Sequence, residues 1–534
     1  MDAATIHRRR WAILAVLCLS LFVIVVDNTI VNVALPTISR ELGASTSQLQ
    51  WIVDAYSLVF AGLLLAAGSL GDRFGRKGAL QVGMIAFAVT SVLAGLAQTP
   101  GQLIAARAAM GVGAALIFPA TLAILTNVFT DPSERAKAIG AWAGVTGLAV
   151  ALGPLTGGWI LEHYAWGAIF LVNVPIAAVA LLLGRVLVPT SRDPGAPRLD
   201  PVGLVLSVVG VVTLVWATIE APSYGWTSTT ILGAYLFGVV VMAAFIAWER
   251  RSTHPMLDVR IFRNARFSAA SVAVAFAFFA LFGFIFLITQ YFQIVRGYDT
   301  LSAGVHTLPF AVAVGITSPL SARLALRIGT KAVVAGGLAL MGAGFLVAST
   351  NGVDTPYWGP VVIAMVLIAA GLGLATAPAT ESIMGALPPE KAGVGSAVND
   401  TTRELGGTLG VAVLGSVFSS VYGPGLVDKL GGLPIPAPAL DAAKESVGAT
   451  LVVAERATAQ AGPQAGQIVL DAARTTFVDG LGAASLVAAA VVFAGAVLAA
   501  LFLPARARSA GPADVDEVDE VGQADHTTDL AGVR

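Results

Sequence analysis

The chain has 534 residues, of which 56% are apolar and only 12% are charged, and its mean hydropathy is +0.82. Soluble domains carry about 25% charged residues, so this composition excludes a water-exposed surface over most of the chain and predicts a lipid environment. The formal net charge of −1 excludes the basic surface that a nucleic-acid partner requires. The single cysteine, Cys18, excludes an internal disulfide, and its place in an apolar run indicates a packing role.

Fourteen segments are long and apolar enough to cross a bilayer, for which a helix needs about 20 mostly apolar residues. In chain order they are 12–35, 50–71, 79–98, 102–126, 138–160, 166–188, 201–219, 229–248, 268–292, 303–325, 332–349, 359–386, 396–421 and 480–503. The first is longer than the apolar core of a signal peptide, about 7–15 residues, and is expected to remain as a span. We therefore predict an all-α membrane protein with 14 transmembrane helices.

The distribution of basic residues predicts the orientation, because short cytoplasmic loops carry an excess of Lys and Arg. With the N-terminus inside, the cytoplasmic side receives Arg8 to Arg10, the loop after the second segment and the arginine cluster between residues 250 and 266. The short outer loops carry only Arg40 and Arg296. Both termini are thus expected to be cytoplasmic, which requires an even number of spans.

An acidic residue, Asp27, lies inside the first apolar segment. An ionised carboxylate at the bilayer centre costs at least about 2.5–3.5 kcal/mol unless something compensates it, and such residues commonly relay protons or bind substrate. Arg107 and Asp54 fall in the outer part of the fourth and second segments, as Asp27 does in the first. We expect Asp27 and Arg107 to be linked, directly or through water. A static structural ion pair is the alternative to one that exchanges a proton.

The loops after the second and the tenth segment share a pattern. The first reads Leu70-Gly71-Asp72-Arg73-Phe74-Gly75-Arg76-Lys77 and the second reads Leu324-Ala325-Leu326-Arg327-Ile328-Gly329-Thr330-Lys331. Leu, Arg, Gly and Lys recur in register, while Leu326 replaces Asp72. The last six segments are therefore expected to repeat the first six, with the seventh and eighth as an inserted hairpin. Parallel six-helix halves around a midplane site are typical of rocking transporters.

This organisation divides the chain into seven parts. They are a cytoplasmic N-terminus (1–11), an N-terminal six-helix domain (12–188), a cytoplasmic linker (189–200), inserted helices 7 and 8 (201–248), a second cytoplasmic linker (249–267), a C-terminal six-helix domain (268–503) and a tail (504–534). Residues 422–479 would form an extracellular loop with one or two short helices, because their Ala-rich stretches have helical spacing. The tail is acidic and lacks aromatic residues, which is typical of disordered segments.

Several motifs, in order and on the expected spans, resemble those of the major facilitator superfamily. Residues 68–77 are similar to its loop 2–3 motif, Leu103, Arg107, Met110, Gly111 and Gly113 to its span-4 arginine motif, and Gly153-Pro154-x-x-Gly157-Gly158 to its antiporter motif, with Ala149 in place of one glycine. Asp27-Asn28-Thr29-Ile30-Val31-Asn32-Val33-Ala34-Leu35-Pro36 resembles the span-1 motif of the 14-span drug:proton antiporters, the family of the quaternary-ammonium multidrug exporters. Residues 51–56 and 403–407 fit the same family, so the resemblance extends over nearly the whole chain to Leu503.

The resemblance implies that ionisable residues in the spans couple proton movement to transport. The candidate proton-coupling residues are Asp27, Arg107, Asp54, Glu381, Asp400 and Glu404. Asp400, Arg403 and Glu404 share one helix face through their i, i+3 and i+4 spacing. The sequence does not rank the three acids of the second half as proton sites, and local salt bridges of Arg403 with Asp400 or Glu381 are the alternative.

The candidate substrate-binding residues are Asp27, Asn32, Asp54, Tyr56 and Arg403. Acids in the first half favour cations electrostatically, and the ring of Tyr56 can add roughly 0.5–2 kcal/mol of cation–π attraction. Asp54 lies nearer the membrane interface. Substrate attraction, a second proton site and simple helix-end polarity are the open alternatives for it.

The candidate conformational-switch residues are Gly71, Asp72, Arg73, Gly75 and Arg76 after the second span, and Gly153, Pro154, Gly157 and Gly158 in the fifth. We expect Gly71 and Gly75 to permit a tight turn, and Asp72 to accept a hydrogen bond from Arg73 or to cap a neighbouring helix end. The glycines of the fifth span, with Pro154, allow close approach and a kink. By resemblance, the loop latches the two halves and the fifth span controls switching and leak. A purely topogenic basic loop is the alternative.

The predicted function is a proton-coupled antiporter that exports amphipathic, cationic drugs or toxic compounds across a bacterial cytoplasmic (inner) membrane by alternating access. The expected partners are a small-molecule substrate, protons and the lipid bilayer, with a monomeric chain and the proton gradient, rather than a cofactor, as energy source. A dedicated exporter of an endogenous lipid, siderophore or antibiotic is the open alternative, and proton symport of an imported compound is another. An enzyme is not expected, because the sequence has no metal-ligand cluster, nucleophile motif or Gly-Lys phosphate loop.

Overall fold

The structure is a computed structural model that describes residues 3–192, 200–253, 255, 257, 259–386, 392–432 and 435–505. The regular structure of these residues is entirely helical, which confirms the predicted all-α class. The predicted acidic tail from residue 506 onward and linker residues 193–199 lie outside the described residues.

The helices of the first half and the helix pair that follows it occupy the chain up to Arg251. The elements are α1 (Ala3–Leu42), α2 (Thr46–Phe74), α3 (Arg76–Gly95), α4 (Pro100–Val128), α5 (Pro132–His163), α6 (Ala168–Leu171), α7 (Asn173–Leu187), α8 (Pro201–Tyr224) and α9 (Thr229–Arg251). The segment expected at 166–188 is broken at Val172. The break follows from Pro175, which has no N–H to donate to the carbonyl of Leu171 and whose ring crowds that carbonyl.

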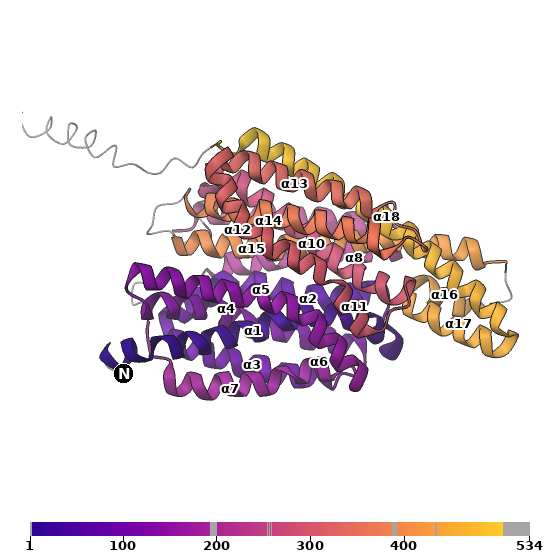
Figure 1. The fold of residues 1–534 in the computed structure, drawn as a ribbon, viewed down its shortest axis with the longest axis horizontal. Helices are drawn as coiled ribbons and strands as arrows, with labels where there is room; N and C mark the ends of the chain where they lie inside the picture. Colours follow the sequence, from indigo (N-terminus) through magenta and orange to yellow (C-terminus); the bar gives the residue numbers. More distant parts are fainter. Residues whose placement is uncertain are drawn as a thin grey trace, which may run out of the picture.

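The second half completes the described chain. Its elements are η1 (Val259–Arg263), α10 (Ala265–Gln290), η2 (Tyr291–Val295), α11 (Thr300–His306), α12 (Leu308–Ile328), α13 (Thr330–Ala348), η3 (Tyr357–Val361), α14 (Val362–Met384), α15 (Ala392–Leu430), α16 (Ala437–Glu445), α17 (Val447–Ala461) and α18 (Pro463–Phe502). Pro309 interrupts the helical ladder between α11 and α12 as Pro175 does between α6 and α7. Figure 1 shows the two halves as two layers, the first in indigo and purple and the second in red to yellow.

The two halves have equivalent packing. α2 packs on α4 as α12 packs on α14, α1 packs on α5 as α10 packs on α15, and α3 packs on α4 as α13 packs on α14. The two loops with the shared sequence pattern also have the same backbone form. Gly75 (φ 122°) ends α2 and Gly329 (φ 92°) ends α12, both in the positive-φ region that favours glycine.

Among the described residues, twelve helices are long and apolar enough to cross a membrane, and the bent α2 brings the number to thirteen. The two pieces of α2, Thr46–Leu64 and Ala66–Phe74, differ in direction by 52°. The remaining expected segment, 138–160, falls on α5, a single helix of 32 residues. Large apolar side chains are exposed on the outside of the bundle, such as Leu182 (67%), Leu236 (67%) and Leu501 (65%). Such a surface is suited to lipid.

The helices α8 and α9 pack on each other, and α8 also packs on α2 of the first half and α15 of the second. Leu58 of α2, Ile219 of α8 and Ala412 of α15 form a separate buried apolar cluster at this junction. The hairpin therefore covers the place where the two halves meet.

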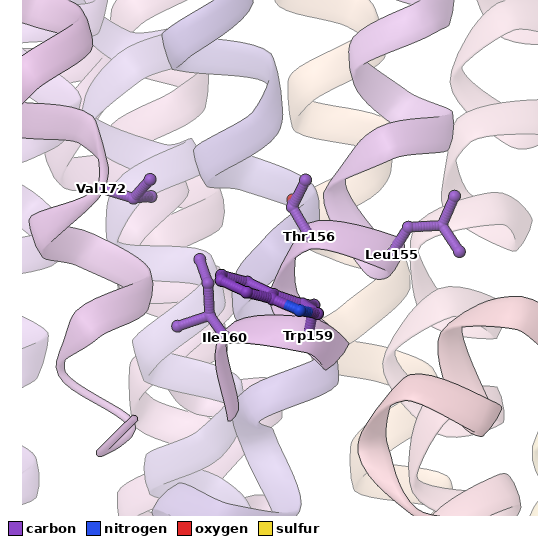
Figure 2. A pocket seen from close by; sticks show the side chains of 5 residues that line it. All are labelled: Leu155, Thr156, Trp159, Ile160 and Val172. Atoms are coloured by element: carbon purple, nitrogen blue, oxygen red, sulfur yellow. The ribbon is translucent and has the colours of Figure 1, made fainter. Parts of the chain in front are cut away.

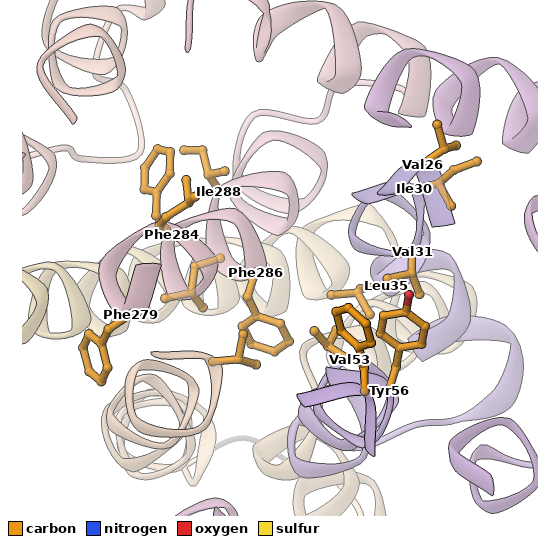
Figure 3. Close-up of a cluster of buried hydrophobic side chains, with 14 of the residues drawn as sticks. Val26, Ile30, Val31, Leu35, Val53, Tyr56, Phe279, Phe284, Phe286 and Ile288 are labelled. Carbon is orange, nitrogen blue, oxygen red and sulfur yellow. The ribbon is translucent and has the colours of Figure 1, made fainter. Parts of the chain in front are cut away.

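Direct contacts between the halves lie at the end of the bundle away from the N-terminus. Thr289 Oγ1 donates to the Asn32 carbonyl oxygen (3.0 Å), Gln293 Nε2 to that of Val33 (2.8 Å) and Gln50 Nε2 to that of Ala412 (2.9 Å). Figure 3 shows buried side chains of α1 and α2, among them Leu35 and Val53, opposite Phe286 of α10. Residues 422–479, predicted to be extracellular and called the outer segment below, include α16 (Ala437–Glu445) and α17 (Val447–Ala461), which lie at this same end in Figure 1.

The outer segment is more helical than the sequence indicated. α15 continues to Leu430 instead of ending near residue 421, and α18 begins at Pro463 instead of near residue 480. The segment also binds the first half, because Ser446 Oγ lies 2.8 Å from Ser39 Oγ and donates to the Ala44 carbonyl oxygen (2.9 Å). α16 and α17 thus connect α1 to the second half.

Candidate functional site

The site with the most buried charge lies in the first half, where α1, α4 and α7 meet. The Arg107 guanidinium of α4 pairs with Asp27 Oδ2 of α1, and both side chains are fully buried. Asn173 Nδ2, at the start of α7, donates to the other carboxylate oxygen, Asp27 Oδ1, at 2.7 Å. The predicted link between Asp27 and Arg107 is therefore present and direct. Both oxygens of the carboxylate are satisfied.

Arg107 also holds α2 against α4. Its Nε donates to the carbonyl oxygen of Ile52 (3.1 Å), and its Cζ lies 4.4 Å from the ring centroid of Tyr56 and 5.9 Å from that of Phe170. The face of Tyr56 is thus occupied by Arg107, and the side chain is fully buried. In this conformation Arg107, and not a substrate, lies against the ring, and substrate binding by Tyr56 stays a prediction.

Asp27 lies farther from the end of its helix than the predicted segment 12–35 indicated. Because α1 continues to Leu42, Asp27 is about 22 Å from the outer end of its helix, at about 1.5 Å per residue. Pro36 does not end α1, which passes through it. The carboxylate therefore lies close to the middle of the long α1.

Asp54 and Asn32 lie near this site but outside it. Asp54 is fully buried, and neither of its carboxylate oxygens has a hydrogen-bond partner among the described residues. Asn32 Nδ2 donates to the carbonyl oxygen of Asn28 (3.1 Å) within α1. Asn32 lies at the contact between the halves through its main chain, which accepts from Thr289.

The acids of the second half are not equivalent. Glu381 is exposed, Asp400 and Glu404 are partly buried, and Glu404 Oε2 is a buried oxygen without a hydrogen-bond partner in the described chain. Glu404 interacts electrostatically with Tyr56, so it reaches toward the first-half site across the interface. Of the three acids in this half, Glu404 is the one whose charge acts on Tyr56, which lies against Arg107.

Arg403 does not form the local salt bridges considered above. Its Nη2 donates to Thr380 Oγ1 (3.0 Å), and its Cζ lies 5.2 Å from the ring centroid of Phe278. Neither Asp400 nor Glu381, both described, lies within ion-pair distance of it. The cation is held by a hydroxyl and an aromatic ring instead.

The loop between α2 and α3 differs from the expectation in two ways. Asp72 accepts from Arg76 Nε (2.6 Å), four residues on, and not from Arg73, whose Cζ lies 5.7 Å from the exposed ring of Phe74. Gly71 is inside α2, where it packs on Ala79, so the turn depends on Gly75 alone. Gly71 keeps a helical backbone, and the first positive φ after it is at Gly75.

Among the described residues, the hydrogen bonds of this loop go to the first half and to the linker that follows it. The main-chain N–H of Arg76 donates to the Ser191 carbonyl oxygen (3.0 Å), and Arg76 Nη1 to that of Ala123 (3.4 Å). Lys77 Nζ donates to the Arg185 carbonyl oxygen (2.8 Å). The loop is thus attached to α4 and α7, at the end of the bundle opposite to the contacts between the halves.

The glycines of α5 lie where this helix crosses α1 and α11. A Cβ on Gly153 would lie 1.9 Å from Thr29 Oγ1, and one on Gly157 would lie 2.7 Å from Ile30 Cγ1. A Cβ on Gly158 would lie 2.6 Å from the carbonyl oxygen of Thr300 in the second half, whose hydroxyl donates to the Gly158 carbonyl (3.1 Å). The predicted close approach is present, and it joins the two halves at the end of the bundle away from the N-terminus. Pro154 takes part, because its carbonyl oxygen faces Gly304.

An apolar hollow of about 330 Å³ lies beside this contact, between α5 and the break at Val172. Figure 2 shows its lining, which consists of Leu155, Thr156, Trp159, Ile160 and Val172. Trp159 is 50% exposed, so the hollow opens to the outside of the bundle and not to the interface between the halves. We assign no transported molecule to it.

Sequence reasoning missed two partners of the candidate residues. Asn173 completes the Asp27 site, and Gln50 Nε2 ties α2 to α15. The sequence feature that could have indicated Asn173 is a polar amide inside an apolar segment, two residues before Pro175. For metals, the described residues hold no group of three or more His, Cys, Asp or Glu side chains that could bind an ion.

Comparisons with known proteins agree with this arrangement. The Major Facilitator Superfamily profile matches residues 17–411. The multidrug efflux pump LfrA of Mycolicibacterium smegmatis is 38% identical over 490 residues, which cover 92% of this chain and 95% of that protein. The tetracenomycin C resistance and export protein of Streptomyces glaucescens is 34% identical over 502 residues (93% and 92%). The methyl viologen resistance protein SmvA of Salmonella typhimurium is 34% identical over 470 residues (88% and 93%).

Solved structures of low sequence identity share the fold. A bacterial homolog of the human lysosomal transporter Spinster, in an inward-facing and occupied conformation, has a TM-score of 0.63 at 18% identity, over 92% of this chain and 97% of that one. The inward-open xylose transporter XylE from E. coli has a TM-score of 0.56 at 13% identity, over 92% and 96%. These similarities support the fold alone.

Proposed function

The chain belongs to the major facilitator superfamily, and from this we propose that it is a proton-coupled antiporter that exports amphipathic, cationic compounds by alternating access. The family and the resistance proteins among its relatives identify a drug efflux transporter rather than an enzyme. Proton coupling, antiport and the preference for cations are the parts of the proposal that go beyond this identification.

The observation that carries the proposal is the buried pair of Asp27 and Arg107. Two charges removed from water are costly unless they are paired and hydrogen-bonded, and breaking such a pair typically costs about 3–5 kcal/mol. A proton that neutralises Asp27 weakens its attraction for Arg107. The pair can therefore link protonation to the packing of α1 against α4, which is the link that an antiporter needs.

A second acid extends this coupling across the interface. Glu404 interacts with Tyr56, and Tyr56 lies against Arg107. A proton on Glu404 would change the field at Arg107 from the side of the second half. We propose Asp27 as the principal proton site, with Glu404 and Asp54 as acids that attract cationic substrate or carry further protons.

We propose fourteen spans, with α5 and the bent α2 each counted as one and with α8 and α9 as an inserted hairpin. The basic loops favour cytoplasmic termini in a bacterial inner membrane. In this orientation the hydrogen bonds between the halves lie on the outer side. The structure then corresponds to a conformation that is closed toward the outside of the membrane. Export requires that the α5–α11 and α1–α10 contacts separate.

The names of the relatives also favour a narrower reading. One relative is a resistance and export protein for a single antibiotic, tetracenomycin C. A dedicated exporter of an endogenous compound would use the same fold and the same proton site. The two readings differ in substrate range and not in mechanism.

Purified protein in liposomes tests the proposal. An imposed pH gradient should drive ethidium movement, and ethidium addition should move protons in the opposite direction, followed with a pH dye inside the liposomes. Asp441→Asn is the matched control for a carboxylate-to-amide change inside the spans, such as Asp27→Asn. Asp441 lies on the exposed helix α16, where it pairs with Lys444, and the variant should transport normally. Ethidium movement with no proton counterflow would contradict antiport. No movement of ethidium or methyl viologen by folded protein would favour a dedicated cargo.

A further inference from the structure

Asn173 has a position that the exporter proposal does not use. It is the first residue of α7, directly after the break at Val172, and it is fully buried. Its Nδ2 donates to Asp27 Oδ1 at 2.7 Å and lies 3.5 Å from Ser91 Oγ of α3. The amide therefore holds the oxygen of Asp27 that Arg107 does not contact.

The other atom of this amide is unused. Asn173 Oδ1 is buried and has no hydrogen-bond partner among the described residues, and the same holds for Arg107 Nη2. Buried polar atoms are nearly always hydrogen-bonded. A free acceptor directly beside the Asp27 carboxyl therefore requires an explanation.

We infer that Asn173 is a positioning residue that adapts to both protonation states of Asp27. An ionised carboxylate only accepts hydrogen bonds, whereas a protonated one also has an O–H donor. The amide of Asn173 donates to ionised Asp27, as the structure shows. When Asp27 Oδ1 takes up a proton, the amide can turn so that its Oδ1 accepts from the new O–H. The proton comes from the water phase: an O–H bond to Asp27 Oδ1 forms as an O–H bond of hydronium breaks, and the turn of the amide changes hydrogen bonds only.

The surroundings restrict this exchange to few groups. The titratable groups that interact with Asp27 are Arg107 on α4 and Tyr56 on α2. The described ionisable residues of α5 and α7 lie toward the ends of those helices, as Glu134, His163 and Arg185 do. Arg107 presents only donors, so it cannot accept from a protonated Asp27. Asn173 is thus the contact that can reverse its hydrogen-bond polarity.

The break before Asn173 gives the exchange a structural consequence. Pro175 interrupts the backbone ladder between α6 and α7, so the start of α7 can move without bending a continuous helix. A change at Asp27 is then passed to α7 as well as to α4. This inference rests on the proposed role of Asp27 as a proton site.

The test measures the protonation of Asp27 directly and separates the two ideas. Infrared difference spectra of the protein in lipid are titrated with pH, and the carboxyl band of Asp27 is identified by its loss in Asp27→Asn. Asn173→Leu should tighten proton binding about tenfold, which equals about 1.4 kcal/mol. Both forms of Asp27 lose a hydrogen bond, but the one lost by the ionised form is charge-assisted and therefore the stronger of the two. The pH profile of ethidium transport should move by the same amount. Asn173→Ser keeps a donor and an acceptor in a smaller side chain, so the proton affinity of Asp27 in this variant should lie between those in wild type and Asn173→Leu. It keeps the test usable if the leucine variant does not fold.

One control and two contrary results complete the test. Asn351→Leu, which removes a buried amide in the other half, should leave the Asp27 titration unchanged. An unchanged titration in folded Asn173→Leu and Asn173→Ser would overturn the role of Asn173 while leaving Asp27 as a proton site. If no carboxyl band is lost in Asp27→Asn, the proposed proton site itself fails.

Discussion

The Asp27 carboxylate on α1 and the Arg107 guanidinium on α4 form an ion pair in which neither side chain is exposed. The same guanidinium donates to the Ile52 carbonyl oxygen of α2. One arginine thus joins three helices of the first half. A buried pair of this kind contributes little net stability, but the loss of one partner leaves an uncompensated buried charge.

Arg107→Leu should therefore be more destabilising than the double variant Asp27→Asn/Arg107→Leu. The single change strands a buried carboxylate and is expected to cost about 3–5 kcal/mol, whereas the double change removes both charges. Thermal or denaturant unfolding in detergent measures the difference. A loss in the double variant equal to the sum of the losses in Arg107→Leu and Asp27→Asn alone would show that the two side chains are not energetically coupled.

The parts of the fold that follow from composition and periodicity could be predicted well. Apolar segments of spanning length are visible in sequence because lipid requires them. The extents of α1, α15 and α18 beyond the membrane could not be predicted in this way, because those residues are polar or mixed and are kept helical by contacts with the outer segment. The breaks at Val172 and Thr307 were readable in principle, since a proline follows each by two or three residues.

Gly158→Ala should disturb the outer contact between the halves. Its Cβ would lie 2.6 Å from the Thr300 carbonyl oxygen, and overpacking of this kind typically costs about 1–3 kcal/mol. We expect a lower Tm and a faster passive proton leak in liposomes. Gly144→Ala is the matched control on the same helix, because its Cβ would meet nothing within 4 Å. A leak that is equal in the two variants would contradict the role assigned to Gly158.

Cysteines at Ser39 and Ser446 should cross-link, since their hydroxyl oxygens lie 2.8 Å apart. Cys18 is the only native cysteine, so Cys18→Ser gives a cysteine-free background. If export requires the outer segment to part from α1, the oxidised protein should bind ethidium but not transport it, and reduction should restore transport. Normal transport by fully cross-linked protein would show that the outer segment moves together with the first half.

The charged residues of the site could be predicted from sequence. Asp27 and Arg107 stand out because a charge in an apolar span is energetically costly and is usually functional. Opposite charges at similar depth also predict that the two residues pair. Asp72 was expected to accept from Arg73 or to cap a helix end, but its partner is Arg76, the first residue of α3, because the positive-φ turn at Gly75 brings the start of α3 back to the end of α2. Asn173 was missed because an uncharged amide is common in spans and only the three-dimensional packing of α7 on α1 brings it to Asp27.

The pair of Glu134 and Arg10 predicts a pH dependence outside the membrane. The hydrogen bonds from Arg10, at 2.8 Å, lower the pKa of the Glu134 carboxyl from its ordinary value. A depressed carboxyl pKa stabilises the fold above the unfolded-state pKa, and this contribution is lost as the pH falls through the folded-state pKa. Glu134→Gln should lower the Tm at pH 7, and its difference from wild type should shrink below about pH 4.3. A Tm difference that stays the same as the pH falls would contradict this assignment.

The central claim is that Asp27 carries the proton that drives export. The most direct measurement compares Asp27→Asn with wild type in two liposome assays: ethidium movement driven by a pH gradient, and exchange of labelled for unlabelled ethidium at equal pH on both sides. The account predicts that the variant loses gradient-driven movement but retains exchange, because substrate binding and the conformational change remain while the proton site is gone. Gradient-driven ethidium movement at the wild-type rate in Asp27→Asn would contradict the account.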